Sequence, residues 1–141
     1  MGLDAVVYRN KANLNLGADE KEARVVAETG EVYFESDALS RKYREQLRAV
    51  ARRIGNVAEV GVLRDEVARS TGTSGFIVTK ILYSATHSGD TIPVESLPAL
   101  SEELTLLRGS ANQSSELRQF VGSFEELVRA AETERNPIVF V

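Results

Sequence analysis

The side chains able to do chemistry are most concentrated around the single histidine of this chain. His87 lies within residues 84–91, which combine an imidazole, four hydroxyl groups and a carboxylate. Histidine titrates near neutral pH and can act as a general base, while serine can act as a nucleophile and aspartate can orient the imidazole. The candidate catalytic residues are therefore His87, Asp90 and Ser88.

The same segment also has the composition of a connecting loop. Gly89 allows a positive φ, Asp90 or Ser88 can form a side-chain turn, and an imidazole can satisfy a backbone carbonyl. Residues this close in sequence seldom surround a histidine ring as a catalytic triad does, and no Gly-x-Ser-x-Gly elbow is present. A structural loop is therefore the favoured interpretation. A binding loop that uses Thr86, His87 and Asp90 comes next, and catalysis last.

A second candidate is a cluster of basic residues. Residues 41–53 hold six lysines and arginines against one glutamate. We expect a helix that begins near Ser36, Asp37 or Ser40 and ends at Gly55 or Asn56. On such a helix four arginines share one narrow arc, which suits phosphates or a partner's carboxylates. These candidate binding residues are Arg41, Arg44, Arg48 and Arg52. An ordinary solvated helix face is the alternative.

A third candidate is an acidic surface on the two helices expected late in the chain. Six glutamates would contribute to it: Glu102, Glu103, Glu125, Glu126, Glu132 and Glu134. Their simplest role is solubility and favourable electrostatics at helix ends. A more specific role is mimicry of a negatively charged substrate, which would let the domain occupy the basic groove of a partner enzyme.

Composition excludes several classes of function. The chain has 141 residues, a net charge of −4 and no cysteine. This charge disfavours nucleic-acid binding, and the absence of thiols excludes disulfides and thiolate metal sites. We expect no metal and no cofactor, because Gly72-Thr73-Ser74-Gly75 lacks the Lys-Ser/Thr of a phosphate-binding loop. No apolar run is long enough to span a membrane and no signal peptide is evident, so we expect a cytoplasmic protein.

The hydrophobic pattern predicts an α+β fold with a single domain over residues 1–141. Four to five helices should pack on a small sheet that includes the N- and C-terminal strands. The expected elements are strands at 4–9 and 138–141, a hairpin of 25–26 with 32–34, and helices at 57–71, 96–108 and 115–135. Residues 76–83 are apolar on both faces, and a buried strand is slightly favoured there over a buried helix.

Three segments resemble those of small, uncharacterised bacterial proteins: the opening Met-Gly-Leu-Asp, residues 82–90, and the ending Asn-Pro-Ile-Val-Phe. The resemblance implies no catalytic residue. In size and charge alone the chain is similar to the immunity proteins that neutralise bacterial toxins. We therefore expect a protein-binding domain, of which an immunity-type inhibitor is one form. The alternative is a small hydrolase or transferase that uses the His87 and Asp90 loop.

Overall fold

A computed structural model describes residues 2–141, and the central feature of these residues is a four-stranded antiparallel sheet. Its strand order is β4-β1-β6-β5. β1 (Gly2–Tyr8) pairs with β4 (Arg48–Asn56) on one side and with β6 (Ile138–Phe140) on the other, and β5 (Thr91–Ile92) closes the order. The N- and C-terminal strands are therefore neighbours, and the predicted α+β class is confirmed.

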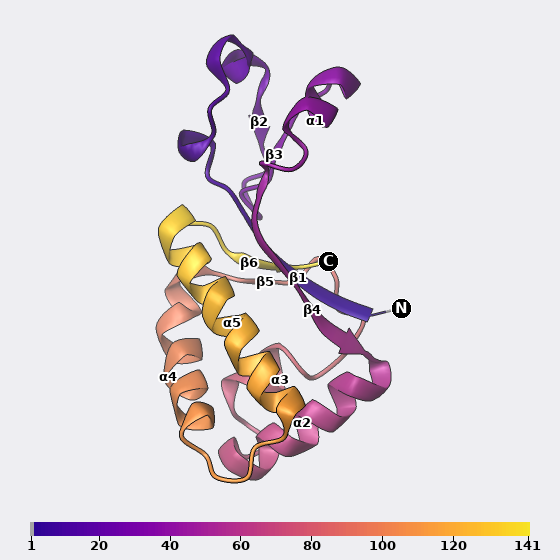
Figure 1. Ribbon diagram of the computed structural model, residues 1–141, viewed down its shortest axis with the longest axis vertical. Coiled ribbons are helices and arrows are strands. Elements are labelled where there is room, and N and C mark those ends of the chain that lie inside the picture. Colours follow the sequence, from indigo (N-terminus) through magenta and orange to yellow (C-terminus); the bar gives the residue numbers. More distant parts are fainter. Residues whose placement is uncertain (1) are drawn as a thin grey trace.

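Four helices cover one face of this sheet and form the main core with it. They gather at the end of the molecule that lies away from β2 and α1 (Figure 1). α5 contacts β1, β4 and β6 directly, and α4 packs beside it. The inward side chains Leu3, Ala5 and Val7 of β1 are almost completely buried. The helices are α2 (Val57–Thr71), α3 (Phe76–Lys80), α4 (Leu97–Arg108) and α5 (Ser115–Glu134).

Residues 9–47 form an arm that projects from the sheet between β1 and β4 (Figure 1). The arm has a small apolar core of its own, in which Phe34 stacks on Tyr43 at 5.2 Å between ring centroids. The Tyr43 hydroxyl donates to Asp19, so a polar contact closes this core on one side. The arm consists of η1 (Lys11–Asn13), η2 (Gly17–Glu22), β2 (Arg24–Val25), β3 (Val32–Tyr33) and α1 (Asp37–Tyr43).

The prediction of one helix that continues to Gly55 or Asn56 is wrong beyond α1. Helix α1 ends at Tyr43, and residues 48–56 form strand β4 instead. The apolar spacing was ambiguous, because Val50 and Ile54 are four residues apart and fall on one face of a strand as readily as of a helix. β1 is buried and needs hydrogen-bond partners on both of its edges, so pairing with β1 decides in favour of a strand.

The strand favoured for residues 76–83 is also wrong, because residues 76–80 form helix α3. A helix this short is unstable alone. Its first free amide groups are held by the carboxylate of Glu103 on α4, which accepts from the backbone of Phe76 at 2.8 Å and of Ile77 at 2.9 Å. A negative charge at a helix N-terminus is also electrostatically favourable.

The remaining long helices follow the sequence pattern. α2 begins with a capping box, in which Asn56 and Glu59 each accept from the other's backbone at 2.9 Å. α5 is capped by Ser114, one residue before the predicted Ser115. The predicted hairpin is confirmed in outline by the pairing of β2 with β3. Local caps and wide apolar faces made α2 and α5 predictable.

Replacement of Glu103 by glutamine should destabilise the fold, because the amide loses the charge and offers one acceptor to two amide groups. We expect E103Q to lower the free energy of unfolding by about 1–3 kcal/mol. Urea denaturation followed by circular dichroism measures this change. The neighbouring E102Q removes the same charge from an exposed glutamate and should stay within about 0.5 kcal/mol of the wild type. Equal losses in the two variants would contradict the capping role.

Candidate functional site

His87 lies in the segment that joins α3 to β5, and its ring is buried between two aromatic side chains. The ring stacks on Tyr83 at a centroid distance of 4.6 Å and meets Phe140 of β6 edge-on at 4.5 Å. Its Nε2 lies 2.7 Å from the carbonyl oxygen of Ile81. Because a carbonyl only accepts, Nε2 carries the hydrogen and donates it. Only 8% of the residue is exposed, so these contacts fix the loop from inside.

Asp90 links His87 to Tyr83. The Tyr83 hydroxyl donates to Asp90 Oδ2, and the same oxygen lies 3.4 Å from His87 Nδ1. Nδ1 has no hydrogen-bond partner within residues 2–141. The hydrogen bond to Asp90 raises the pKa of the Tyr83 phenol, and burial and the negative charge of Asp90 add to the effect. The three side chains thus form one cluster in which the carboxylate is shared.

The outer side of this cluster faces a hollow of about 470 Å³. Lys80 and Tyr83 border it on one side, and Asp90 and Ser96 of the 3-10 helix η3 (Val94–Ser96) also line it. His87 is not among the lining residues. Its nitrogens face Ile81 and Asp90 rather than the hollow, so the imidazole is poorly placed to take a proton from a bound substrate.

The hydroxyl residues on either side of His87 do not join the cluster. Thr86 and Ser88 are exposed, and the backbone of Thr86 donates to Ser84 Oγ at 3.1 Å. No hydrogen bond between Ser88 and His87 occurs in the part of the chain that the structure describes. Gly89 has a φ of 98° and donates to the Phe140 carbonyl at 2.7 Å, as a tight loop requires. The structure therefore brings His87 and Asp90 together and leaves Ser88 apart.

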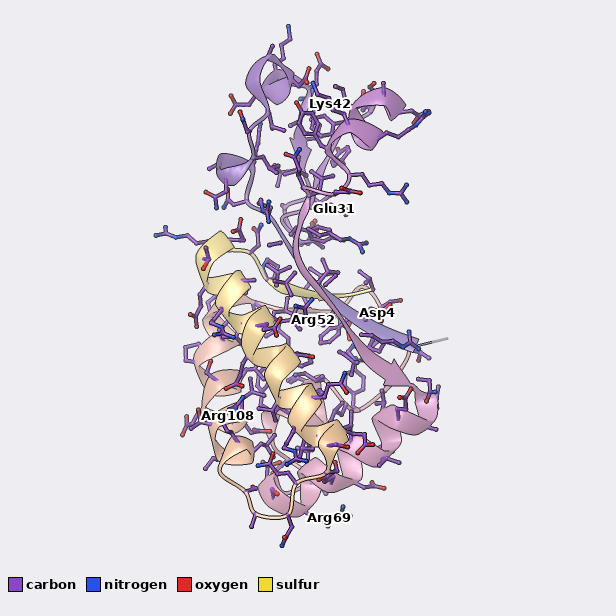
Figure 2. All side chains as sticks on the ribbon, in the orientation of Figure 1. Asp4, Glu31, Lys42, Arg52, Arg69 and Arg108 are labelled. Atoms are coloured by element: carbon purple, nitrogen blue, oxygen red, sulfur yellow. The ribbon has the colours of Figure 1, made fainter. Side chains whose placement is uncertain are left out.

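The arginine ridge predicted on one helix does not exist. Arg41 lies on α1 and Arg44 in the turn after it, whereas Arg48 and Arg52 lie on strand β4. Figure 2 shows this separation, with Lys42 in the arm and Arg52 in the body of the molecule. The ridge depended on a continuous helix, and that helix ends at Tyr43. Arg52 is also engaged already, because it pairs with a glutamate of α5, Glu126.

Most of the acidic candidates contact other parts of the chain. Glu103 caps α3, Glu125 pairs with Arg108, and Glu126 pairs with Arg52. Glu134 is buried at the base of the arm, where its carboxylate accepts from the Asn10 backbone at 2.8 Å. Glu102 and Glu132 remain exposed. Much of the glutamate excess at the end of the chain is therefore structural rather than available to a partner.

A groove that the sequence did not reveal lies between β4, α2 and α5. We call it the α2–α5 groove. Its cavity measures about 390 Å³. Ile54, Leu63 and Phe120 give it apolar walls, and Val62 lies at its margin with 64% of the residue exposed. Val57, at the start of α2, is equally exposed. Charged and polar side chains form the rim: Arg53, Glu59, Glu116, Gln119 and Ser123.

One sequence signal for this groove was present but ambiguous. The inward stripe of α2 consists of Val60, Leu63 and Val67. Val57 and Val62 are also apolar, and in the structure they lie outside that buried stripe. An apolar residue outside the core-facing stripe of an otherwise amphipathic helix is a weak indication of a second contact surface. The groove itself required three distant segments to be placed together.

Replacement of His87 by alanine should destabilise the fold and leave the exposed side chains unchanged, because the ring is buried. The variant loses two aromatic contacts and leaves the Ile81 carbonyl without its donor. We expect H87A to lower the free energy of unfolding by about 2–4 kcal/mol, measured by urea denaturation. The exposed neighbour provides the control, since S88A should change the value by less than about 0.5 kcal/mol. An H87A variant as stable as wild type would refute the structural role of the ring.

The Tyr83 phenol should ionise at a higher pH than an ordinary tyrosine, because Asp90 accepts its hydroxyl hydrogen. A raised pKa favours the protonated form in the folded state. This contribution to stability is therefore complete below about pH 10, the usual tyrosine pKa. It is lost as the pH rises through the folded-state value. Absorbance titration of wild type against Y83F isolates this phenol. In D90N its pKa should fall, and an unchanged value would show that Asp90 is not the cause.

Residues 2–141 contain no group of three or more histidine, cysteine or carboxylate side chains placed to hold a metal ion. None of the helices within these residues is long and apolar enough to cross a membrane. No protein-family model matches the chain, and comparisons with curated proteins and with solved structures likewise find no match.

Proposed function

We propose that this chain is a protein-binding domain and that its partner docks on the α2–α5 groove. The observation that carries the proposal is an apolar cavity open to solvent, with Val62 exposed at its margin. Apolar surface around a preformed hollow with a polar rim is characteristic of interaction sites. A partner side chain that entered the cavity would bury this surface and would be the main source of affinity.

The partner that this proposal favours is a toxin or another enzyme, which the chain would inhibit in the manner of an immunity protein. The size of the domain and its net charge of −4 support this form of the proposal. Negative charge increases the rate of association with a basic partner. The absence of cysteine suits the bacterial cytoplasm, where we place the interaction.

The alternative function, a small hydrolase or transferase at the His87 and Asp90 loop, has less support. A general base needs a nitrogen within reach of the substrate proton. In His87, Nε2 donates to the Ile81 carbonyl, and the buried Nδ1 lies 3.4 Å from the carboxylate of Asp90. Within residues 2–141, the supporting candidate Ser88 makes no hydrogen bond to the ring. Burial of the histidine suits a role in holding the loop, in agreement with the structural interpretation of this segment.

A charged side chain at Val62 should abolish partner binding and leave the fold intact, because Val62 is exposed at the groove margin. The measurement is cross-linking and affinity capture from bacterial cells, followed by the dissociation constant for each purified candidate. We expect V62K to weaken binding of the true partner at least about tenfold, because it removes an apolar contact and adds a like charge opposite a basic partner. The matched control is V25K, which places the same charge on an exposed valine of the arm. A candidate whose dissociation constant is the same for both variants does not bind at the groove.

A further inference from the structure

The rim of the α2–α5 groove has an excess of negative charge. Three charged side chains line it: Arg53, Glu59 and Glu116. The positive charge is compensated, because Arg53 lies 3.6 Å from the carboxylate of Asp4. Glu59 uses one oxygen in the capping box of α2 and keeps its charge. Glu116 is exposed in the first turn of α5. An occupant of the groove therefore meets an apolar floor beneath two carboxylates.

The walls of the groove determine which backbone conformation the occupant can have. They consist mainly of side chains of α2 and α5, whose backbone groups are already bonded within the helices. An extended peptide would find no row of free donors and acceptors there. β4 is at the edge of the sheet, but it contributes only Arg53, Ile54 and Gly55 to the groove, a short stretch beside a bulge in its pairing with β1. A helix satisfies its own backbone and needs only side-chain contacts.

We propose that the α2–α5 groove binds a basic amphipathic helix of the partner protein, with one apolar side chain in the cavity and lysines or arginines opposite Glu59 and Glu116. This inference rests on the proposed function and names the chemistry of the partner. The cation excess of such a helix complements the rim, and the apolar face covers Val62 and Phe120. Complementary charge would also give the association a strong dependence on salt.

The probe is a designed helix of leucine and lysine about four turns long. A matched peptide with glutamate in place of lysine tests the sign of the charge. Binding is measured by fluorescence anisotropy at low and at physiological salt. We expect the lysine peptide to bind wild-type protein and the glutamate peptide to bind at least about tenfold more weakly. V62K, which adds a charge of the same sign as the peptide, should weaken the lysine peptide by a similar factor, and added salt should weaken the wild-type complex.

Two glutamate variants of α5 separate local recognition from general attraction to an acidic protein. E116Q removes a rim charge and should weaken the lysine peptide about two- to fivefold. E132Q removes the same charge from an exposed position about 24 Å further along the helix. It should leave the affinity unchanged. Equal losses in both variants, or equal binding of the two peptides, would overturn the inference.

The occupant could instead be a second copy of the chain, and sedimentation of the protein alone tests this outcome. A concentration-dependent dimer that V62K abolishes would overturn the inference in favour of self-association. If binding of a partner protein depends on Val62 but the lysine peptide does not bind, the inference is wrong and the proposed function stands. If no protein depends on Val62, the proposed function itself is wrong, whatever the peptides do.

Discussion

The fold depends on the burial of the second half of its first strand. Ala5, Val6 and Val7 of β1 have no exposed surface, so water cannot satisfy the backbone of this strand on either face. Both of its edges must therefore be paired by other segments. β4 pairs with one edge and β6 with the other. Just past the end of β6, the backbones of Asp4 and Val141 exchange two further hydrogen bonds. The ends of the chain are thus held together, and the arm is the excursion between β1 and β4.

Long-range carboxylates perform a similar task in the helical layer. Glu103 caps α3 from α4, and Glu66 of α2 accepts from the backbone of Ser114 at 2.9 Å where α5 begins. At the base of the arm, Glu134 accepts from the Asn10 backbone. Each of these glutamates satisfies amide groups that a local side chain leaves free. The acidic composition is therefore partly a consequence of how the helices begin, and the positions of the exposed carboxylates determine the charge that a partner meets.

Elements defined by local signals were predictable, and elements defined by distant partners were not. α2 and α5 combine caps with long apolar faces, which a single sequence reveals. β4 and α3 do not: the spacing of Val50 and Ile54 fits two structures, and α3 depends on Glu103, 27 residues after Phe76. The same distinction applies to the site. The pairing of His87 with Asp90 is local in sequence, whereas the α2–α5 groove requires β4, which the sequence pattern assigned to a helix.

The distribution of unused charge and apolar surface bears on function more directly than the presence of reactive side chains. His87 is the most reactive group in the sequence, yet the fold encloses it between Tyr83 and Phe140. Its Nε2 donates to the Ile81 carbonyl and its Nδ1 is buried, so the ring has little left to offer a ligand. Val62 contributes little to the core, so packing gives no reason for an apolar side chain at this position, whereas Glu116 also favours the start of α5. Recognition of a partner with a complementary apolar and basic surface would use both side chains.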